Sequence, residues 1–264
     1  MFRLLIATIF AGALSYAGPF VYVTSFSGQF GTVDVTTGVF TSLGTTMAGE
    51  IAGLGAKIYG TDGTNFVSVN PLNGVTTTIA ALSVSVDEFT SLNNTIYLES
   101  LDHKLYTVNP ANGAVTLVGN TGLTDPVGNG LAVSLIGGQT SKLYATVNGF
   151  DFGTFGPINP PSRLYQLSTA NGAATSIGLT GLPLSDGSFT CGVIIGGVMY
   201  NFSFNGVVTK EYILNATTGA LIGSMVVAGL NGVEGLAFTT PEPGALVLCL
   251  SGAAMLGVMR RRRG

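Results

Sequence analysis

Three glutamates beside short, recurring apolar segments are the residues best placed to do chemistry. They stand in the sequences E-I-A-G-L, E-F-T-S-L and E-G-L-A-F, at Glu50, Glu88 and Glu234. If these segments are equivalent strands of one repeated unit, the carboxylates converge at one mouth of a central channel. Such a ring could bind a cation through oxygen ligands, or two carboxylates could act as acid and base on a glycoside. A carboxylate just before a strand is also commonly a solvated loop residue, so that alternative stays open.

A long insertion, residues 147–162, is the second candidate. It holds Phe150, Phe152 and Phe155 among glycines and prolines. Long loops on a rigid scaffold often carry binding residues, and exposed aromatic rings suit a sugar or a protein partner. The alternative is a loop that packs its phenylalanines over the neighbouring strands.

Other reactive residue types offer no recognisable site. Cys191 and Cys249 lie far apart, and the single histidine, His103, is expected to be exposed at a loop tip. No phosphate-binding glycine motif, nucleophile elbow or metal-ligand cluster is found, so we expect no catalytic residue, metal or cofactor.

The charge distribution argues against a nucleic-acid partner. Charged residues make up 9% of the 264 residues, and five of the 10 basic residues, Arg3 and Arg260 to Arg263, lie in the two ends. Phosphate binding needs clustered Lys and Arg, which the rest of the chain lacks.

The elements that must position these residues are repeated hairpins. The sequence K-L-Y-T-V-N-P-A-N-G-A-V-T-L-V-G, residues 104–119, alternates apolar and polar side chains on both sides of a turn. Pro110 fixes φ for the second position of a turn, Asn109 can bond the backbone beyond it, and Gly113 can take positive φ. The segment therefore predicts two antiparallel strands.

Five copies of this hairpin can be aligned on a tyrosine and a turn glycine. The tyrosines are 37, 38, 47 and 56 residues apart, a period typical of propellers. We expect the tyrosines to pack between neighbouring units rather than bind a ligand. The pairs are Tyr22 and Gly38, Tyr59 and Gly74, Tyr97 and Gly113, Tyr144 and Gly172, and Tyr200 and Gly219.

An apolar strand precedes every tyrosine except the first. These strands are predicted at residues 51–54, 89–92, 131–135 and 189–195, whereas residues 234–238 are left over at the far end. Pairing of that last strand with the first unit would close a ring and protect its edges. The sequence thus predicts an all-β, five-bladed β-propeller over residues 18–240, with a β-sandwich as the alternative.

Both ends of the chain have the sequence features of targeting segments. Residues 1–17 have Arg3, an apolar run and small residues before Ala17, as a secretory signal peptide has. Residues 241–264 begin with Pro241, Glu242 and Pro243, continue without charge from residue 244 to 259, and end in Arg260, Arg261, Arg262 and Arg263. The uncharged run predicts a transmembrane helix with its arginines in the cytoplasm, so the body lies outside. A permanent anchor is the alternative to a removable signal.

These motifs resemble those of known families. The hairpin repeat is similar to the L-Y-x-[VI]-[ND]-P-x-x-G repeat of bacterial secreted propellers, which carries no catalytic residue. The tail resembles the PEP-CTERM sorting signal of exopolysaccharide-producing Gram-negative bacteria, and a similar tail occurs on some ice-binding proteins. The resemblance implies transient anchoring in the inner membrane, processing by an exosortase-type enzyme, and release to the cell surface or extracellular matrix.

The expected function follows from this destination and from the lack of a catalytic motif. We expect a non-enzymatic binding or structural protein whose partner is an extracellular polysaccharide or a matrix protein. The alternative is a secreted glycan-active hydrolase or lyase that uses the glutamate ring.

Overall fold

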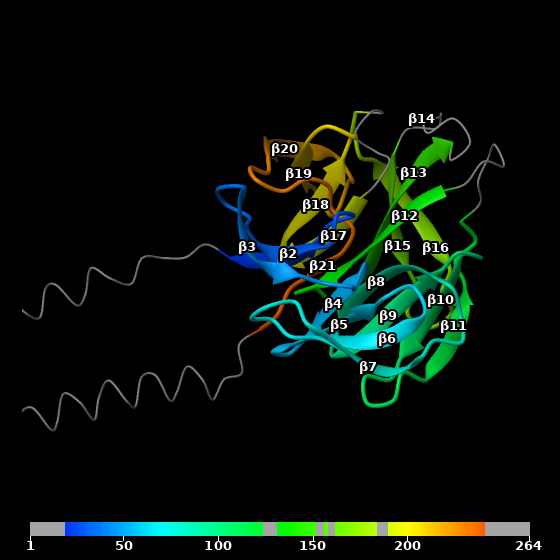
Figure 1. Ribbon diagram of the computed structural model, residues 1–264. Coiled ribbons are helices and arrows are strands. Elements are labelled where there is room, and N and C mark those ends of the chain that lie inside the picture. Colours follow the sequence, from blue (N-terminus) through cyan, green and yellow to red (C-terminus); the bar gives the residue numbers. More distant parts are fainter. Residues whose placement is uncertain (1–18, 124–130, 152–155, 158–161, 184–189, 241–264) are drawn as a thin grey trace, which may run out of the picture.

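The computed structural model describes residues 19–123, 131–151, 156–157, 162–183 and 190–240. Over these residues the chain is all-β (Figure 1). Within the described ranges, no helix is long and apolar enough to span a membrane. The predicted signal peptide, residues 1–17, and the predicted sorting signal, residues 241–264, lie outside the described residues.

The strands form antiparallel units of four. The first two units are separate sheets, in the orders β21-β1-β2-β3 and β4-β5-β6-β7. Units three, four and five have the orders β8-β9-β10-β11, β12-β13-β15-β16 and β17-β18-β19-β20, and they join into one 13-stranded sheet because β12 pairs in parallel with β8 and β17. This arrangement is β-propeller-like, as the repeat predicted.

The bounds of the strands in units one and two are β1 (Phe20–Thr24), β2 (Gln29–Asp34), β3 (Val39–Thr45), β4 (Ile51–Leu54), β5 (Lys57–Thr61), β6 (Asn65–Val69), β7 (Thr76–Ala81) and β21 (Leu236–Ala237). Those of unit three are β8 (Val86–Leu92), β9 (Thr95–Ser100), β10 (Lys104–Val108) and β11 (Val115–Asn120). Those of units four and five are β12 (Leu131–Gly138), β13 (Leu143–Asp151), β14 (Gly156–Pro157), β15 (Arg163–Leu167), β16 (Ala174–Leu179), β17 (Thr190–Ile195), β18 (Val198–Phe204), β19 (Thr209–Leu214) and β20 (Leu221–Val226).

The repeated turn has the structure that its sequence predicts. Strands β10 and β11 pair in antiparallel fashion around Asn109, whose carbonyl oxygen accepts the Gly113 N–H at 2.8 Å. The Asn109 side chain accepts the Ala111 N–H at 2.9 Å. Gly113 has a φ of 69°, which only glycine adopts without strain. The equivalent turn glycines have φ between 68° and 81°: Gly38, Gly74, Gly172 and Gly219.

The repeated tyrosines hold neighbouring units together, as predicted. Tyr97 of unit three is buried with Leu135 and Leu143 of unit four. Tyr200 of unit five is buried in the same way with Val21 of unit one, so the last unit packs against the first. Since burial of apolar surface is the main favourable term in folding, these clusters are what joins the units. The other tyrosines in such clusters are Tyr22, Tyr59 and Tyr144.

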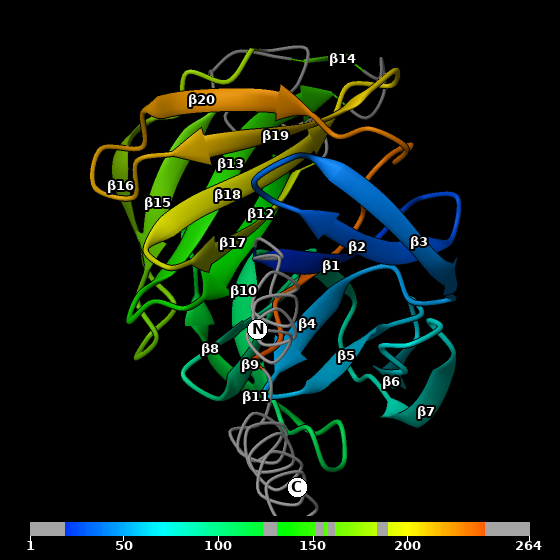
Figure 2. The ribbon, with the colours of Figure 1, turned by 90° about the vertical axis from the view of Figure 1, so that its left-hand side faces the viewer.

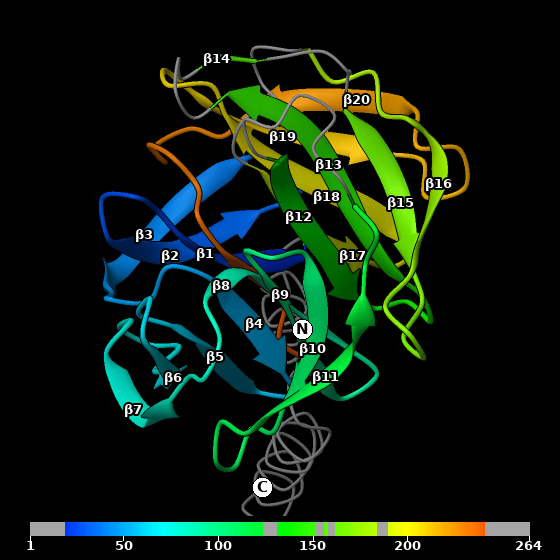
Figure 3. The ribbon, with the colours of Figure 1, turned by 90° about the vertical axis from the view of Figure 1, so that its right-hand side faces the viewer.

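The leftover C-terminal strand completes the first unit, as the sequence predicted. Strand β21 is shorter than expected, and it pairs with β1 through Tyr22 opposite Ala237 and Val23 opposite Leu236. The innermost strands then contact one another in the cyclic order β21, β4, β8, β12, β17 and back to β21. Figure 2 shows the units following one another around this centre, and Figure 3 shows the same units from the opposite side.

Close approach of the innermost strands explains why so many of their residues are glycine. A Cβ atom at Gly53 of β4 would lie 1.9 Å from the Phe238 carbonyl oxygen, just after β21. A Cβ atom at Gly137 of β12 would lie 2.1 Å from the carbonyl oxygen of Ser91 in β8. No side chain fits at either position, so these glycines set the width of the centre.

Candidate carboxylate site

The structure places the three predicted glutamates at the starts of innermost strands. Glu50 directly precedes β4, and Glu234 lies two residues before β21. Glu88 lies within β8, which begins at Val86, so the prediction that it precedes its strand is wrong. Antiparallel pairing with the end of β9 extends β8 by these residues.

The three carboxylates are close enough to repel one another. Burial raises the pKa of Glu50 well above its usual value, and the charge of Glu234 raises it further. Burial likewise raises the pKa of Glu88, with a further contribution from Glu50. The pKa of Glu234 is also raised by burial. Burial therefore disfavours the charged form of each carboxyl group in the ring.

Backbone hydrogen bonds within units one and two position two of the glutamates. The N–H of Glu234 donates to the carbonyl oxygen of Thr24 in β1 at 2.9 Å, and the carbonyl oxygen of Glu50 accepts the Thr61 N–H at 3.1 Å. A Cβ atom at Gly49 would lie 2.4 Å from Glu234 Oε1. Gly49 therefore leaves the space that the Glu234 carboxyl group occupies between the first two units.

The innermost glutamate side chains do not present both oxygens to solvent. Glu88 is only 6% exposed and accepts the backbone N–H of Leu135. One oxygen of Glu88 and one of Glu50 are buried without a hydrogen-bond partner among the described residues. The buried Cys191 thiol lies near the same glutamates, since its pKa is raised first by burial and then by their charges. The site is thus a cluster of acidic side chains in the interior.

A second acidic group beside this ring was not predicted. Glu99 at the end of β9 is fully buried, and its Oε1 lies 2.9 Å from Nδ1 of His103. Asp87 lies close enough to Glu99 for the two carboxyl groups to change each other's pKa. Burial and the Glu99 charge raise the pKa of Asp87 to about 8, although His103 acts in the opposite direction. The hydrogen bond to Glu99 raises the pKa of His103.

The prediction that His103 is exposed at a loop tip is wrong. His103 adopts a φ of 56°, and its side chain is only 24% exposed. The turn places the imidazole beside Glu99, where it supplies the buried carboxylate with a hydrogen-bond partner. The sequence held a signal of this contact, since the two residues lie four positions apart at the ends of one hairpin connection.

The predicted phenylalanine loop is partly strand. Strand β13 runs through Asp151, and Phe150 pairs through its backbone with Pro157 of β14. The expectation of a loop from residue 147 is therefore wrong for its first residues, because they extend the pairing of β12 with β13. Phe152 and Phe155 lie outside the described residues.

A metal centre is not assembled by the described residues. No group of three or more His, Cys, Asp or Glu in these ranges is arranged to hold a metal ion. The cation interpretation of the glutamate ring therefore finds no geometric support there.

Comparisons with known proteins find distant likenesses among solved structures. No protein-family model and no curated protein matches the chain. A chain of a nidogen–laminin complex is 10% identical, with 83% of this chain and 97% of that chain covered and a TM-score of 0.46. A luciferin-regenerating enzyme is 13% identical, with coverage of 82% and 69% and a TM-score of 0.46. BamB from Moraxella catarrhalis is 15% identical, with coverage of 82% and 75% and a TM-score of 0.33.

Proposed function

We propose that the chain is an exported, five-bladed β-propeller that binds an extracellular polysaccharide and does not turn it over. The observation that carries this proposal is the cyclic order of contacts among β21, β4, β8, β12 and β17, with β21 closing the first unit. Such a closed scaffold holds its loops rigidly and supports binding at either mouth.

The state of the glutamate ring favours binding over hydrolysis. A glycosidase needs one protonated and one ionised carboxyl group on opposite sides of its substrate bond. Burial raises the pKa of Glu50, Glu88 and Glu234 alike, which disfavours the ionised partner that such a pair needs. The hydrogen bond with His103 partly offsets the effect of burial on the pKa of Glu99. Glu99 is nevertheless fully buried and out of reach of a substrate.

A combined binding and turnover assay tests this function. The full-length protein, screened against bacterial polysaccharides, is expected to bind at least one without releasing reducing ends. The variants Glu50→Gln and Glu88→Gln are expected to bind within about twofold of the wild type, because glutamine keeps the size of glutamate and removes only a charge that burial already disfavours. Turnover that Glu50→Gln abolishes would instead establish the hydrolase or lyase alternative.

We also propose that residues 241–264 are a removable sorting signal read by an exosortase-type enzyme. The proposal rests on the order of Pro241, Glu242 and Pro243, the uncharged run and the arginine cluster. The Thr240 N–H donates to the Gly55 carbonyl oxygen at 2.9 Å, so the described fold is tied down up to the residue before the motif. An enzyme that cut at the motif would thus leave every described strand intact.

Changes in the tail are expected to retain the protein in the inner membrane. Glu242→Ala removes the central residue of the motif, and deletion of residues 260–263 removes the cytoplasmic charges. Fractionation of expressing cells should find most of either variant with the membrane, whereas Lys142→Ala, a surface control, should be released like the wild type. Normal release of both tail variants would overturn the sorting proposal.

A further inference from the structure

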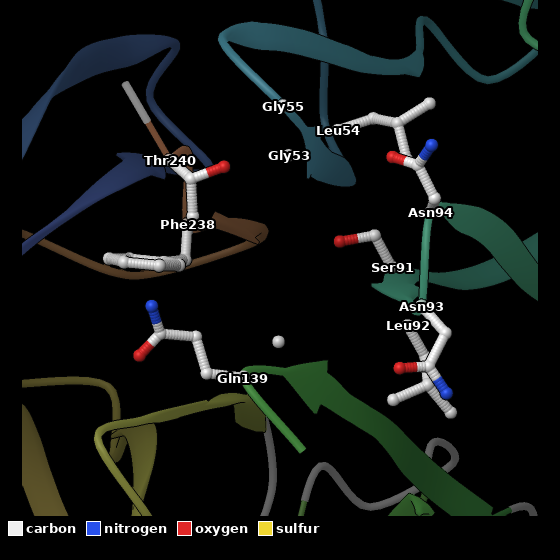
Figure 4. Close-up of a pocket in the computed structure, with 11 residues that line it drawn as sticks. Gly53, Leu54, Gly55, Ser91, Leu92, Asn93, Asn94, Gln139, Phe238 and Thr240 are labelled. Carbon is white, nitrogen blue, oxygen red and sulfur yellow. The ribbon is translucent and has the colours of Figure 1, made fainter. Parts of the chain in front are cut away.

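The ends of the innermost strands opposite the glutamates border a cavity of about 130 Å³ (Figure 4). Glutamates stand at the starts of β4 and β8, whereas the cavity lies where β4, β8 and β12 end. The two mouths of the centre therefore differ in chemistry. The side chains that matter at the cavity are Ser91, Asn93, Asn94, Gln139, Phe238 and Thr240.

The lining is polar, uncharged and aromatic on one side. Figure 4 shows the Ser91 hydroxyl directed into the space from the β8 side, with Gln139 beside the Phe238 ring across from it. Gln139 Oε1 accepts the Gly196 N–H at 2.9 Å, which fixes the direction of its amide group. No Asp, Glu, Lys or Arg lines the cavity.

The hairpin that presents two of these amides is conformationally unusual. Asn93 and Asn94 have φ of 47° and 64°. The matching hairpin of unit five fills the same kind of turn with Gly196 and Gly197, at φ of 58° and 82°. Glycine and asparagine are the residues that most readily adopt these angles in a two-residue hairpin turn. The Asn94 side chain is exposed and makes no hydrogen bond to another described residue, so its amide is accessible to a ligand.

We propose that this cavity is the carbohydrate subsite of the protein and that it takes an uncharged sugar ring. The inference rests on the proposed polysaccharide-binding function and names its site and ligand class. An engineered cavity of about 150 Å³ admits benzene, so the volume suits a six-membered ring. Each side-chain amide can donate to one sugar hydroxyl and accept from another, and Phe238, which packs partly against the core between units five and one, borders the cavity. A carboxylated or phosphorylated sugar would find no cationic side chain to pair with.

A second hollow of about 380 Å³ serves as an internal comparison. It lies on the outer strands between units two and three and includes Ser68, Pro71, Ile79 and Pro110. Most of its lining residues are apolar, and none of them carries a side-chain amide. Ser68 therefore provides a serine of similar chemistry away from the proposed subsite.

The test compares Ser91→Ala and Asn94→Gly with the control Ser68→Ala in the full-length protein. Asn94→Gly removes the amide while retaining positive φ, so folding is expected to be preserved. The ligands are the methyl glycosides of glucose, galactose and mannose, with methyl glucuronide as the charged counterpart of the first. Titration followed by chemical shift should show about tenfold weaker binding, or none, for both cavity variants, and binding within about twofold of the wild type for Ser68→Ala.

The outcomes separate this inference from the function on which it rests. Polysaccharide binding that is unchanged in Ser91→Ala and Asn94→Gly would overturn the subsite and leave the binding function standing. Equal or stronger binding of the glucuronide would overturn the uncharged ligand class. Failure of the wild type to bind any polysaccharide would defeat the binding function, and the subsite with it.

Discussion

A chain that starts at Gly18 and stops at Val227 is expected to lose cooperative folding and to aggregate. The cut removes β21 and with it four backbone or hydroxyl hydrogen bonds between Thr24 and Glu234 or Gly235. It also removes the buried side chains of Leu230, Val233 and Leu236, which pack between units five and one. Each such side chain contributes about 1.5–3 kcal/mol, so the loss is on the order of 5 kcal/mol or more, comparable to the whole stability of a typical domain.

The matched comparison is a chain that starts at the same residue and stops at Thr240. It keeps every described strand. We expect it to unfold in one transition, with a melting temperature close to that of the secreted protein. Thermal melts and size-exclusion chromatography measure both properties. Equal melting temperatures and equal monomer fractions for the two truncations would show that β21 does not close the fold.

Glu211→Gln is expected to stabilise the protein at pH 8.5 and to have little effect at pH 4.5. Glu211 in β19 is fully buried, and neither of its carboxyl oxygens has a hydrogen-bond partner among the described residues. Burial, with a smaller contribution from the charge of Asp34, raises its pKa to about 8. In the unfolded chain this carboxyl group ionises near its ordinary value of about 4.3.

The direction of the effect follows from proton binding. Between pH of about 4.5 and 8 the folded chain keeps the Glu211 proton that the unfolded chain has lost, so the free energy of unfolding falls as pH rises through this range. Glutamine carries no such proton, and its variant should gain on the order of 2–4 kcal/mol over the wild type at pH 8.5. Urea unfolding at several pH values measures the gain.

An exposed carboxylate provides the control for Glu211→Gln. Asp102→Asn also removes one negative charge, but its side chain is 56% exposed, and its hydrogen bond to Lys104 lowers rather than raises the pKa. We expect no gain from Asp102→Asn at alkaline pH. A gain for Glu211→Gln that is the same at pH 4.5 and 8.5, or that Asp102→Asn reproduces, would contradict this account.

The buried carboxyl groups as a whole make the free energy of unfolding depend on pH in the same direction as Glu211 does. The pKa values of Glu50, Glu88, Asp87 and Glu99 are all raised, mainly by burial. Each therefore favours the folded chain at mildly acidic pH and favours it less as pH rises.

Local chemistry made the repeating unit predictable from the sequence. The turn around Asn109 and Gly113 depends on residues within one hairpin, so its φ and its hydrogen bonds follow from residue types alone. The tyrosine period predicted which side chains pack between units. The first unit lacks the inner strand that the other units have, and a surplus strand remains near Leu236. The sequence therefore predicted that this strand completes the first unit, because an unpaired strand edge needs a partner.

The same register placed Glu50, Glu88 and Glu234 at one end of the innermost strands, but what surrounds them was decided by tertiary structure. Asp87, Glu99 and His103 join the acidic interior through burial and a turn, and the spacing of Glu99 and His103 alone does not predict that burial. Burial of Glu211 likewise depends on packing against unit one, more than 150 residues away along the chain.

The cavity at the opposite mouth depends wholly on the fold. Ser91 and Asn94 come from one hairpin, Gln139 from another unit, and Phe238 from the closing segment. Each is an ordinary residue in its own stretch of sequence, and only the ring of strands brings them together. The sequence by itself determined the repeated hairpins, because turns and strand patterns are local. The tertiary structure decided which polar side chains are buried and which share a cavity, because burial and proximity depend on contacts between distant segments.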